Sequence, residues 1–194
     1  TKLSYEQKSI NKRDYQKKIK DLLSLSKSAK NTLNIEDKIQ TLGKDFANSK
    51  GSMFLGRGYS YPIALEGALK LKELAYVHAE GYPAGEMKHG PLALIEEGMP
   101  VVVIAPRDEH YKKTISNMQE VISRGAKVLL ITNKSTDEIY SENIWEQIEV
   151  DAISDELIPF LTTIPLQKLA YYSALDKGYD IDKPRNLAKS VTVE

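Results

Sequence analysis

Three charged residues recur at helical spacing inside an otherwise apolar segment. Residues 61–77 (YPIALEGALKLKELAYV) have the periodicity of a helix, and at roughly 100° per residue Glu66, Lys70 and Glu73 fall on one narrow stripe. Small or apolar residues form the opposite side: Ala64, Ala68, Leu71 and Ala75. We therefore expect this helix to pack closely on a sheet while its charged stripe faces a cleft. Two carboxylates beside an ammonium can hold unequal pKa values, so one of them could carry a proton near neutral pH.

The charged stripe also has a plain alternative. Glu and Lys three or four residues apart on a solvent-exposed helix stabilise it by only about 0.2–0.5 kcal/mol per pair. Charged stripes of this kind are common on helices that simply face water. Residue spacing alone does not separate this interpretation from a catalytic one.

One of the three histidines lies in a setting that favours chemistry. His89 is followed by Gly90 and Pro91, which hold the backbone away from a regular helix and direct side chains outward. An imidazole in such a loop could transfer protons near neutral pH or could have a structural role. His78 and His110 lack this setting and are predicted to be ordinary surface or core residues. No second histidine or carboxylate lies at ligand spacing from His89, so no metal site is predicted.

The closing segment, residues 185–194 (RNLAKSVTVE), is too apolar for a frayed terminus. Its apolar residues predict that it packs against another part of the protein and carries Lys189 with it. A lysine in a partly desolvated cleft has its neutral amine favoured, and that amine can attack a ketone to form an imine. A solvated lysine is the alternative.

Short apolar runs alternate with helical patterns from Gly51 onward. Strands are predicted at 53–56, 77–82, 100–105, 127–132 and, as an edge strand, 147–150. Helices are predicted at 61–77, within 85–97, at 111–124 and at 157–177. Nearly continuous apolar strands that alternate with helices indicate an α/β fold with a doubly wound parallel sheet, sandwiched by helices in a flavodoxin-like arrangement.

The first fifty residues have fewer apolar positions than the rest of the chain, and they predict a helical arm. Thinly spaced apolar positions indicate two amphipathic helices that are broken near residues 31–34. The basic stretch 12–20 is interrupted by Asp14 and has no accompanying aromatic motif, so a solvated helix face is favoured over an RNA-binding one. The Gly56-Arg57-Gly58 sequence between a strand and a helix could hold an anion, but it is too short to be specific and favours a tight turn.

The composition limits the classes of partner. The chain has 194 residues with 27 basic and 27 acidic side chains, so no overall field attracts nucleic acid or anionic lipid. Cysteine is absent, which excludes disulfides, thiolate metal sites and cysteine nucleophiles and fits a reducing, cytoplasmic location. There is no apolar run of membrane-spanning length and no export leader, so we expect neither membrane insertion nor secretion.

Four motifs in order resemble one enzyme family. They are FLGRG at 54–58, ALEGALKLKE at 64–73, HAEGYPAGEMKHGPLALI at 78–95 and PRNLAKSVTVE at 184–194. Together they resemble the isomerase part of the glutamine:fructose-6-phosphate aminotransferases, also called glucosamine-6-phosphate synthases. The resemblance covers essentially the whole chain. It implies a helical linker at 1–50, the second sugar isomerase (SIS) subdomain at 51–178 and a catalytic tail at 179–194.

The resemblance also implies roles for individual residues. Fructose 6-phosphate would form an imine with Lys189 at its C2 carbonyl, and Glu73 would move a proton between C1 and C2. Lys70 would stabilise charge or relay a proton, with Glu66 as a supporting carboxylate. His89 would assist ring opening from a neighbouring subunit, which makes the expected site composite and dimeric. Neither a metal nor an organic cofactor is expected, because the imine itself acidifies the neighbouring carbon.

The chain departs from the family's pattern in two ways. It has no cysteine, whereas the family's glutaminase domain begins with a cysteine nucleophile, so this chain cannot release ammonia from glutamine. The first SIS subdomain, which grips the sugar phosphate, also has no counterpart. We therefore expect the chain to be the carboxy-terminal piece of a longer enzyme and to be weakly active or inactive alone. A non-catalytic sugar-phosphate-binding SIS module is the alternative function, and a purely structural dimerisation domain is a third.

Overall fold

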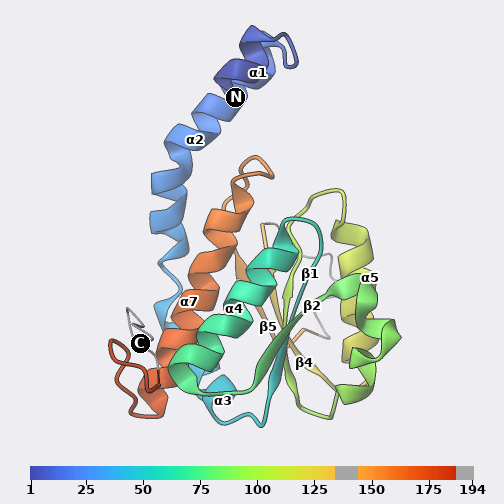
Figure 1. Cartoon of the computed structure of the whole chain (residues 1–194), viewed down its shortest axis with the longest axis vertical. Coiled ribbons are helices and arrows are strands. Elements are labelled where there is room, and N and C mark those ends of the chain that lie inside the picture. The colour runs from blue at the N-terminus through green and yellow to red at the C-terminus, as the bar shows by residue number, and fades with distance from the viewer. Residues whose placement is uncertain (134–143, 187–194) are drawn as a thin grey trace, which may run out of the picture.

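A parallel five-stranded sheet lies at the centre of the molecule (Figure 1). The computed structural model describes residues 1–133 and 144–186. In chain order the strands are β1 (Ser52–Gly56), β2 (Ala79–Pro83), β3 (Pro100–Ile104), β4 (Lys127–Thr132) and β5 (Glu146–Glu149). Their spatial order is β2-β1-β3-β4-β5, and every neighbouring pair is parallel. This is the doubly wound, flavodoxin-like order, with its switch point between β1 and β3, so the predicted fold class is confirmed.

Helices cover both faces of the sheet (Figure 1). One face is covered by α3 (Glu36–Ala47), α4 (Ser60–Ala75) and α7 (Ile158–Asp176). The other is covered by α5 (Tyr111–Ile122) together with the short 3₁₀ helices η1 (Ala84–His89) and η2 (Pro91–Leu94). Successive strand residues alternate between these two layers: Phe54 packs on the α4 side, while Met53 and Leu55 pack on the α5 side. Burial on both faces explains why the strands are nearly continuous apolar runs.

The amino-terminal arm contains α1 (Lys2–Glu6) and α2 (Lys12–Thr32), and α2 extends beyond the sheet (Figure 1). Asn11 caps α2 by accepting a hydrogen bond from the Asp14 backbone N–H at 2.9 Å. Two contacts tie α2 to the segment before α7: Asn31 donates to Asp151 at 2.9 Å, and Lys18 pairs with Glu156. The two predicted helices are α2 and α3, and the break falls between Thr32 and Glu36 as expected.

Two local predictions need correction. The helix predicted within 85–97 is instead a pair of 3₁₀ helices separated at Gly90, whose φ of +141° is open to glycine and strained for other residues. The helix predicted to reach Val77 ends at Ala75, because Tyr76 adopts the left-handed conformation (φ 53°, ψ 33°) and closes it. Hydrophobic periodicity reveals neither the two 3₁₀ helices nor the left-handed conformation of Tyr76.

Close helix packing at Gly43 gives a testable stability effect. A Cβ at Gly43 would lie 2.6 Å from Tyr172 Cβ and 3.0 Å from the Ser173 backbone nitrogen, so α3 and α7 leave no room for a methyl group. We expect Gly43→Ala to lower the free energy of unfolding by about 1–3 kcal/mol in urea titrations, despite the better helix propensity of alanine. The control is Gly51→Ala, whose Cβ would meet its nearest atom at 3.4 Å. Equal stability of the two variants would contradict this packing.

Candidate active site

Helix α4 brings the three predicted charges together. Lys70 Nζ donates to Glu73 Oε2 at 2.7 Å and lies 3.7 Å from Glu66 Oε1. The three side chains are about one third exposed, whereas the opposite residues Ala64, Ala68, Leu71 and Ala75 are at most 1% exposed. The predicted division of α4 into a charged stripe (Glu66, Lys70 and Glu73) and a packed small-residue face is confirmed. That the stripe faces a cleft stays a prediction.

The charged stripe holds Lys70 in its ammonium form. The hydrogen bond with Glu73 is the main cause that raises the pKa of Lys70 above its ordinary value, aided by the charge of Glu66 and opposed by partial burial. A raised folded-state pKa means that the stabilising pair is fully present below the ordinary lysine pKa and is lost only as pH rises through the folded one. Lys70 is therefore suited to stabilise negative charge or donate a proton, and unsuited to act as a base near neutral pH.

This charge state predicts how the pH profile responds to Lys70→Arg. Arginine stays protonated at all working pH values, so it copies the charge of Lys70 but not the shape of its ammonium group. In the complete enzyme we expect the rate to change while the alkaline limb between about pH 7 and 9.5 keeps its midpoint, because Lys70 does not titrate there. The measurement is kcat/KM against pH for both proteins. A displaced alkaline midpoint would mean that Lys70 does lose its proton in this range.

His89 lies away from the charged stripe within one chain. It is the last residue of η1, its side chain is 74% exposed, and its Nε2 is 3.7 Å from Glu86 Oε2. The outward orientation predicted for His89 is confirmed. However, η1 packs on the α5 face of the sheet and α4 covers the other face. The structure therefore brings Glu66, Lys70 and Glu73 together and does not bring His89 to them.

Lys189 lies outside the described residues, but the segment that leads to it is tied to α4. The Arg185 guanidinium lies 4.1 Å from the centre of the Tyr76 ring, and the Arg185 backbone N–H donates to the Tyr76 hydroxyl at 2.7 Å. Tyr179 packs on the same ring, with centroids 4.7 Å apart. Lys177 Nζ donates to the Ala75 carbonyl at 3.1 Å. The segment after α7 is thus held at the end of α4, one helical turn from Glu73.

Residues Gly56-Arg57-Gly58 form a tight turn, as predicted. A Cβ at Gly56 would collide with the Ser60 backbone, and Gly58 has a φ of +52°. Its arginine points elsewhere: Arg57 Nε donates to Asn117 Oδ1 at 3.2 Å. Sequence reasoning missed this contact, and also the one between Tyr76 and Arg185, because each joins distant segments that no local pattern links.

The sheet's switch point, where doubly wound folds often bind ligands, does not suit a phosphate here. A small crevice beside the ends of β1 and β3 is lined by Tyr59, Pro106, Asp108, Asp155 and Pro159. Burial, with the charges of Asp108 and Glu156, raises the pKa of Asp155. Two carboxylates would repel a phosphate dianion, and Pro159 offers no N–H donor. The two carboxylates therefore make this crevice a poor site for a phosphate.

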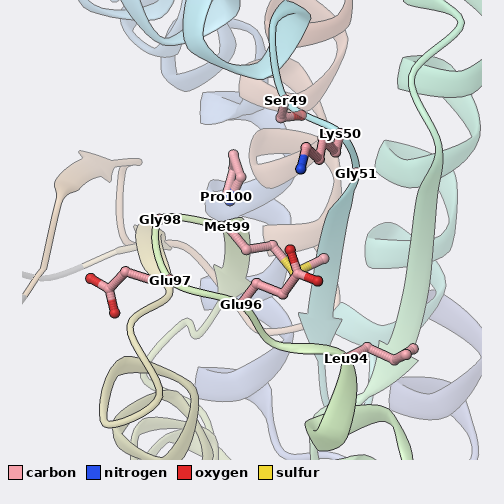
Figure 2. Close-up of a pocket in the computed structure, with 9 residues that line it drawn as sticks. All are labelled: Ser49, Lys50, Gly51, Leu94, Glu96, Glu97, Gly98, Met99 and Pro100. Atoms are coloured by element: carbon pink, nitrogen blue, oxygen red, sulfur yellow. The ribbon is translucent and has the colours of Figure 1, made fainter.

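A second, wider hollow lies at the opposite end of the sheet. Figure 2 shows it at the amino ends of β1 and β3, where Lys50 and Glu96 line it together with Met99 and Pro100. Of the predicted site residues that the structure describes, none lines it. Within residues 1–133 and 144–186, no group of three or more His, Asp or Glu could hold a metal ion. Among those residues, too, no helix combines the length and the apolar character that a bilayer crossing needs.

Comparison with known proteins places this geometry in a family. The sequence pattern of the SIS domain matches residues 45–176. The glutamine–fructose-6-phosphate aminotransferase [isomerizing] of Bacteroides thetaiotaomicron is 50% identical over 192 residues, which is 99% of this chain and 31% of that protein. The same-named protein of Brucella abortus is 52% identical over 162 residues, 84% of this chain and 27% of that protein. The chain therefore spans about three tenths of these curated relatives.

A solved structure agrees with the sequence relatives. The C-terminal domain of glucosamine-fructose-6-phosphate aminotransferase from Francisella tularensis superposes with a TM-score of 0.81 at 41% identity. The match covers 91% of this chain and 49% of that one. This chain is thus similar to about half of that solved C-terminal domain.

Proposed function

The chain belongs to the SIS domain family, and we propose that it is the second isomerase subdomain of an enzyme that makes glucosamine 6-phosphate from fructose 6-phosphate and glutamine-derived ammonia. The observation that carries this proposal is the Lys70–Glu73 pair at 2.7 Å on a helix that is otherwise packed against the sheet. It places a carboxylate beside a permanent positive charge, which is what a proton transfer between adjacent carbons of an imine requires.

The proposed reaction begins at Lys189. Its neutral amine attacks the C2 carbonyl of the opened ketose, and water leaves as the imine forms. Ammonia then displaces the lysine and leaves a new imine on the sugar. Glu73 takes a proton from C1 and returns it to C2, while the imine nitrogen gains a proton and the C1 hydroxyl loses one, which converts the ketose imine to the amino aldose. Lys70 stabilises the negative charge that develops between these steps, and Glu66 supports Lys70.

The contact between Arg185 and Tyr76 supports the proposal that Lys189 and Glu73 act at the same site. Lys189 follows Arg185 by four residues, so a fully extended backbone separates their Cα atoms by no more than about 14 Å. Tyr76 follows Glu73 by three residues, a rise of about 5 Å along a helix. A tail that starts at Tyr76 can therefore reach the charged stripe.

We further propose that the working site is shared between two subunits. His89 and the charged stripe lie over opposite faces of the sheet, so a single copy of the chain does not present both to one sugar. In a homodimer, His89 of one subunit would assist ring opening at the charged stripe of the other. Under this proposal residues 1–50 are the linker, 51–178 the second SIS subdomain and 179–194 the tail of a cytoplasmic enzyme. Its glutaminase and first SIS parts lie in the rest of the polypeptide.

Turnover by the complete polypeptide tests the proposal. With fructose 6-phosphate and an ammonium salt, which bypasses the glutaminase step, we expect the complete enzyme to form glucosamine 6-phosphate. This chain alone should convert the sugar weakly or not at all, because the phosphate grip is elsewhere. Binding of fructose 6-phosphate by the complete polypeptide without any turnover would instead indicate a non-catalytic sugar-phosphate-binding module. Robust turnover by this chain alone would contradict the proposal that another part of the enzyme must bind the sugar phosphate.

A further inference from the structure

We infer that Arg57 is a positioning residue that fixes the backbone of η1 and thereby the point at which His89 is presented. The inference rests on the role proposed above for His89. Arg57 belongs to the turn between β1 and α4, whereas η1 follows β2, so the two segments meet only in the folded chain.

The Arg57 side chain occupies the volume that a side chain at position 85 would need. A Cβ built on Gly85 would lie 2.9 Å from Arg57 Cζ and closer still to its terminal nitrogen. Gly85 does not have a positive φ, so a side chain there would meet the arginine but would not strain the backbone. The guanidinium therefore lies against the second residue of η1.

Asn117 holds the arginine in this position. Arg57 Nε donates to Asn117 Oδ1 at 3.2 Å, and Asn117 is 7% exposed within α5. Among residues 1–133 and 144–186, no carboxylate forms an ion pair with Arg57. Arg57 therefore has no salt-bridge partner among these residues. It contacts the Asn117 side chain of α5 and lies against Gly85 of η1.

The rest of η1 is attached to the same helix. Met87 is fully buried on the α5 face, and Lys88 Nζ lies 3.0 Å from Glu120 Oε1. Asn117 and Glu120 are three residues apart and so share one face of α5. Gly85, Met87 and Lys88 are all held, whereas His89 is exposed. His89 is therefore an exposed side chain at the end of a segment that is held to α5, and its place depends on the contacts that hold Gly85 and Lys88.

The first arm of the test is a cycle of substitutions at Arg57 and Gly85 in the complete enzyme. Gly85→Ala should weaken catalysis strongly when Arg57 is present, because the new methyl group displaces the guanidinium. In an Arg57→Ala background the same substitution should have little further effect. Hydrogen–deuterium exchange should rise in the 84–89 peptide of Arg57→Ala while the α4 peptide stays unchanged. Additive effects at the two positions, or unchanged exchange at 84–89, would overturn the inference.

The second arm asks whether Arg57 acts through His89. Arg57→Ala alone should lower kcat between about tenfold and a hundredfold, as misplacement of a catalytic group does. In a His89→Asn background it should cause no further loss. Arg124→Ala is the matched control, because Arg124 donates hydrogen bonds to the Glu120 carbonyl and the Ser123 hydroxyl and not to η1; it should stay near the wild-type rate. If Arg57→Ala fails to fold, Arg57→Lys takes its place, with the same expected loss and non-additivity.

The outcomes separate this inference from the proposed function. A further loss of rate on adding Arg57→Ala to His89→Asn would overturn the positioning role while leaving the role of His89 intact. Full activity of His89→Asn would overturn both, because Arg57 would then have no catalytic group to position. Loss in each single variant with no added loss in the pair is the result that the geometry predicts.

Discussion

Glu73→Gln in the complete enzyme is expected to lower kcat by about 10²–10⁴-fold, the range associated with the loss of a general acid–base group. Glutamine keeps the size of glutamate but cannot accept and return the proton between C1 and C2. The measurement is glucosamine 6-phosphate formed from fructose 6-phosphate and ammonium at saturating concentrations. Glu96→Gln is the matched control, because Glu96 is exposed in the hollow of Figure 2, which Glu66, Lys70 and Glu73 do not line, and it should keep the wild-type rate.

Two further measurements show whether the loss of kcat comes from the proton-transfer step. Thermal stability of Glu73→Gln should change little, because the Lys70–Glu73 pair is about one third exposed and pairs of that kind contribute up to about 1 kcal/mol. The variant should also still form the lysine imine, since that step precedes the proton transfer. A folded Glu73→Gln enzyme with an undiminished kcat would remove Glu73 from the mechanism.

Lys189→Arg should reduce kcat by at least about a thousandfold. The guanidinium retains a positive charge but stays protonated, so it has no free amine with which to attack the ketose. Removal of a group that forms a covalent intermediate usually leaves only the rate supplied by binding and the remaining groups. The measurement is the same product assay, together with the affinity for fructose 6-phosphate, which should change far less than kcat.

Lys183→Arg provides the control for Lys189→Arg. Lys183 is exposed in the same tail, residues 179–194, and it contacts Asp180 through its backbone N–H, which the substitution keeps. We expect wild-type turnover from this variant. Comparable losses in the two variants would indicate that the segment tolerates no arginine, and would withdraw the support for an imine at Lys189.

The sequence was sufficient for features that depend on one element at a time. The charged stripe of α4 follows from a period of 3.6 residues within a single helix, and the strands follow from short apolar runs that are buried on both faces. Packing against the sheet requires small residues on the inner side of α4, and those residues are visible in the sequence as Ala64 and Ala68.

The missed features join segments that are far apart in the chain. Arg57 and Asn117 are separated by 60 residues, and Tyr76 and Arg185 by 109. Their contacts depend on which loops the fold brings together, and no periodicity encodes that. The position of His89 on the far face from the charged stripe has the same origin: the motif marks the histidine as exposed, but only the layer order of the sheet shows which face it occupies.

Borohydride reduction tests the central claim, that a tail lysine and Glu73 act on adjacent carbons of one opened sugar. The complete enzyme would be incubated with fructose 6-phosphate without ammonia, reduced, digested and mapped by mass spectrometry. Our account predicts one sugar-phosphate adduct, on Lys189, that is retained in Glu73→Gln and absent from Lys189→Arg. An adduct on Lys70 or another lysine, or no adduct in an enzyme that is otherwise active, would contradict it.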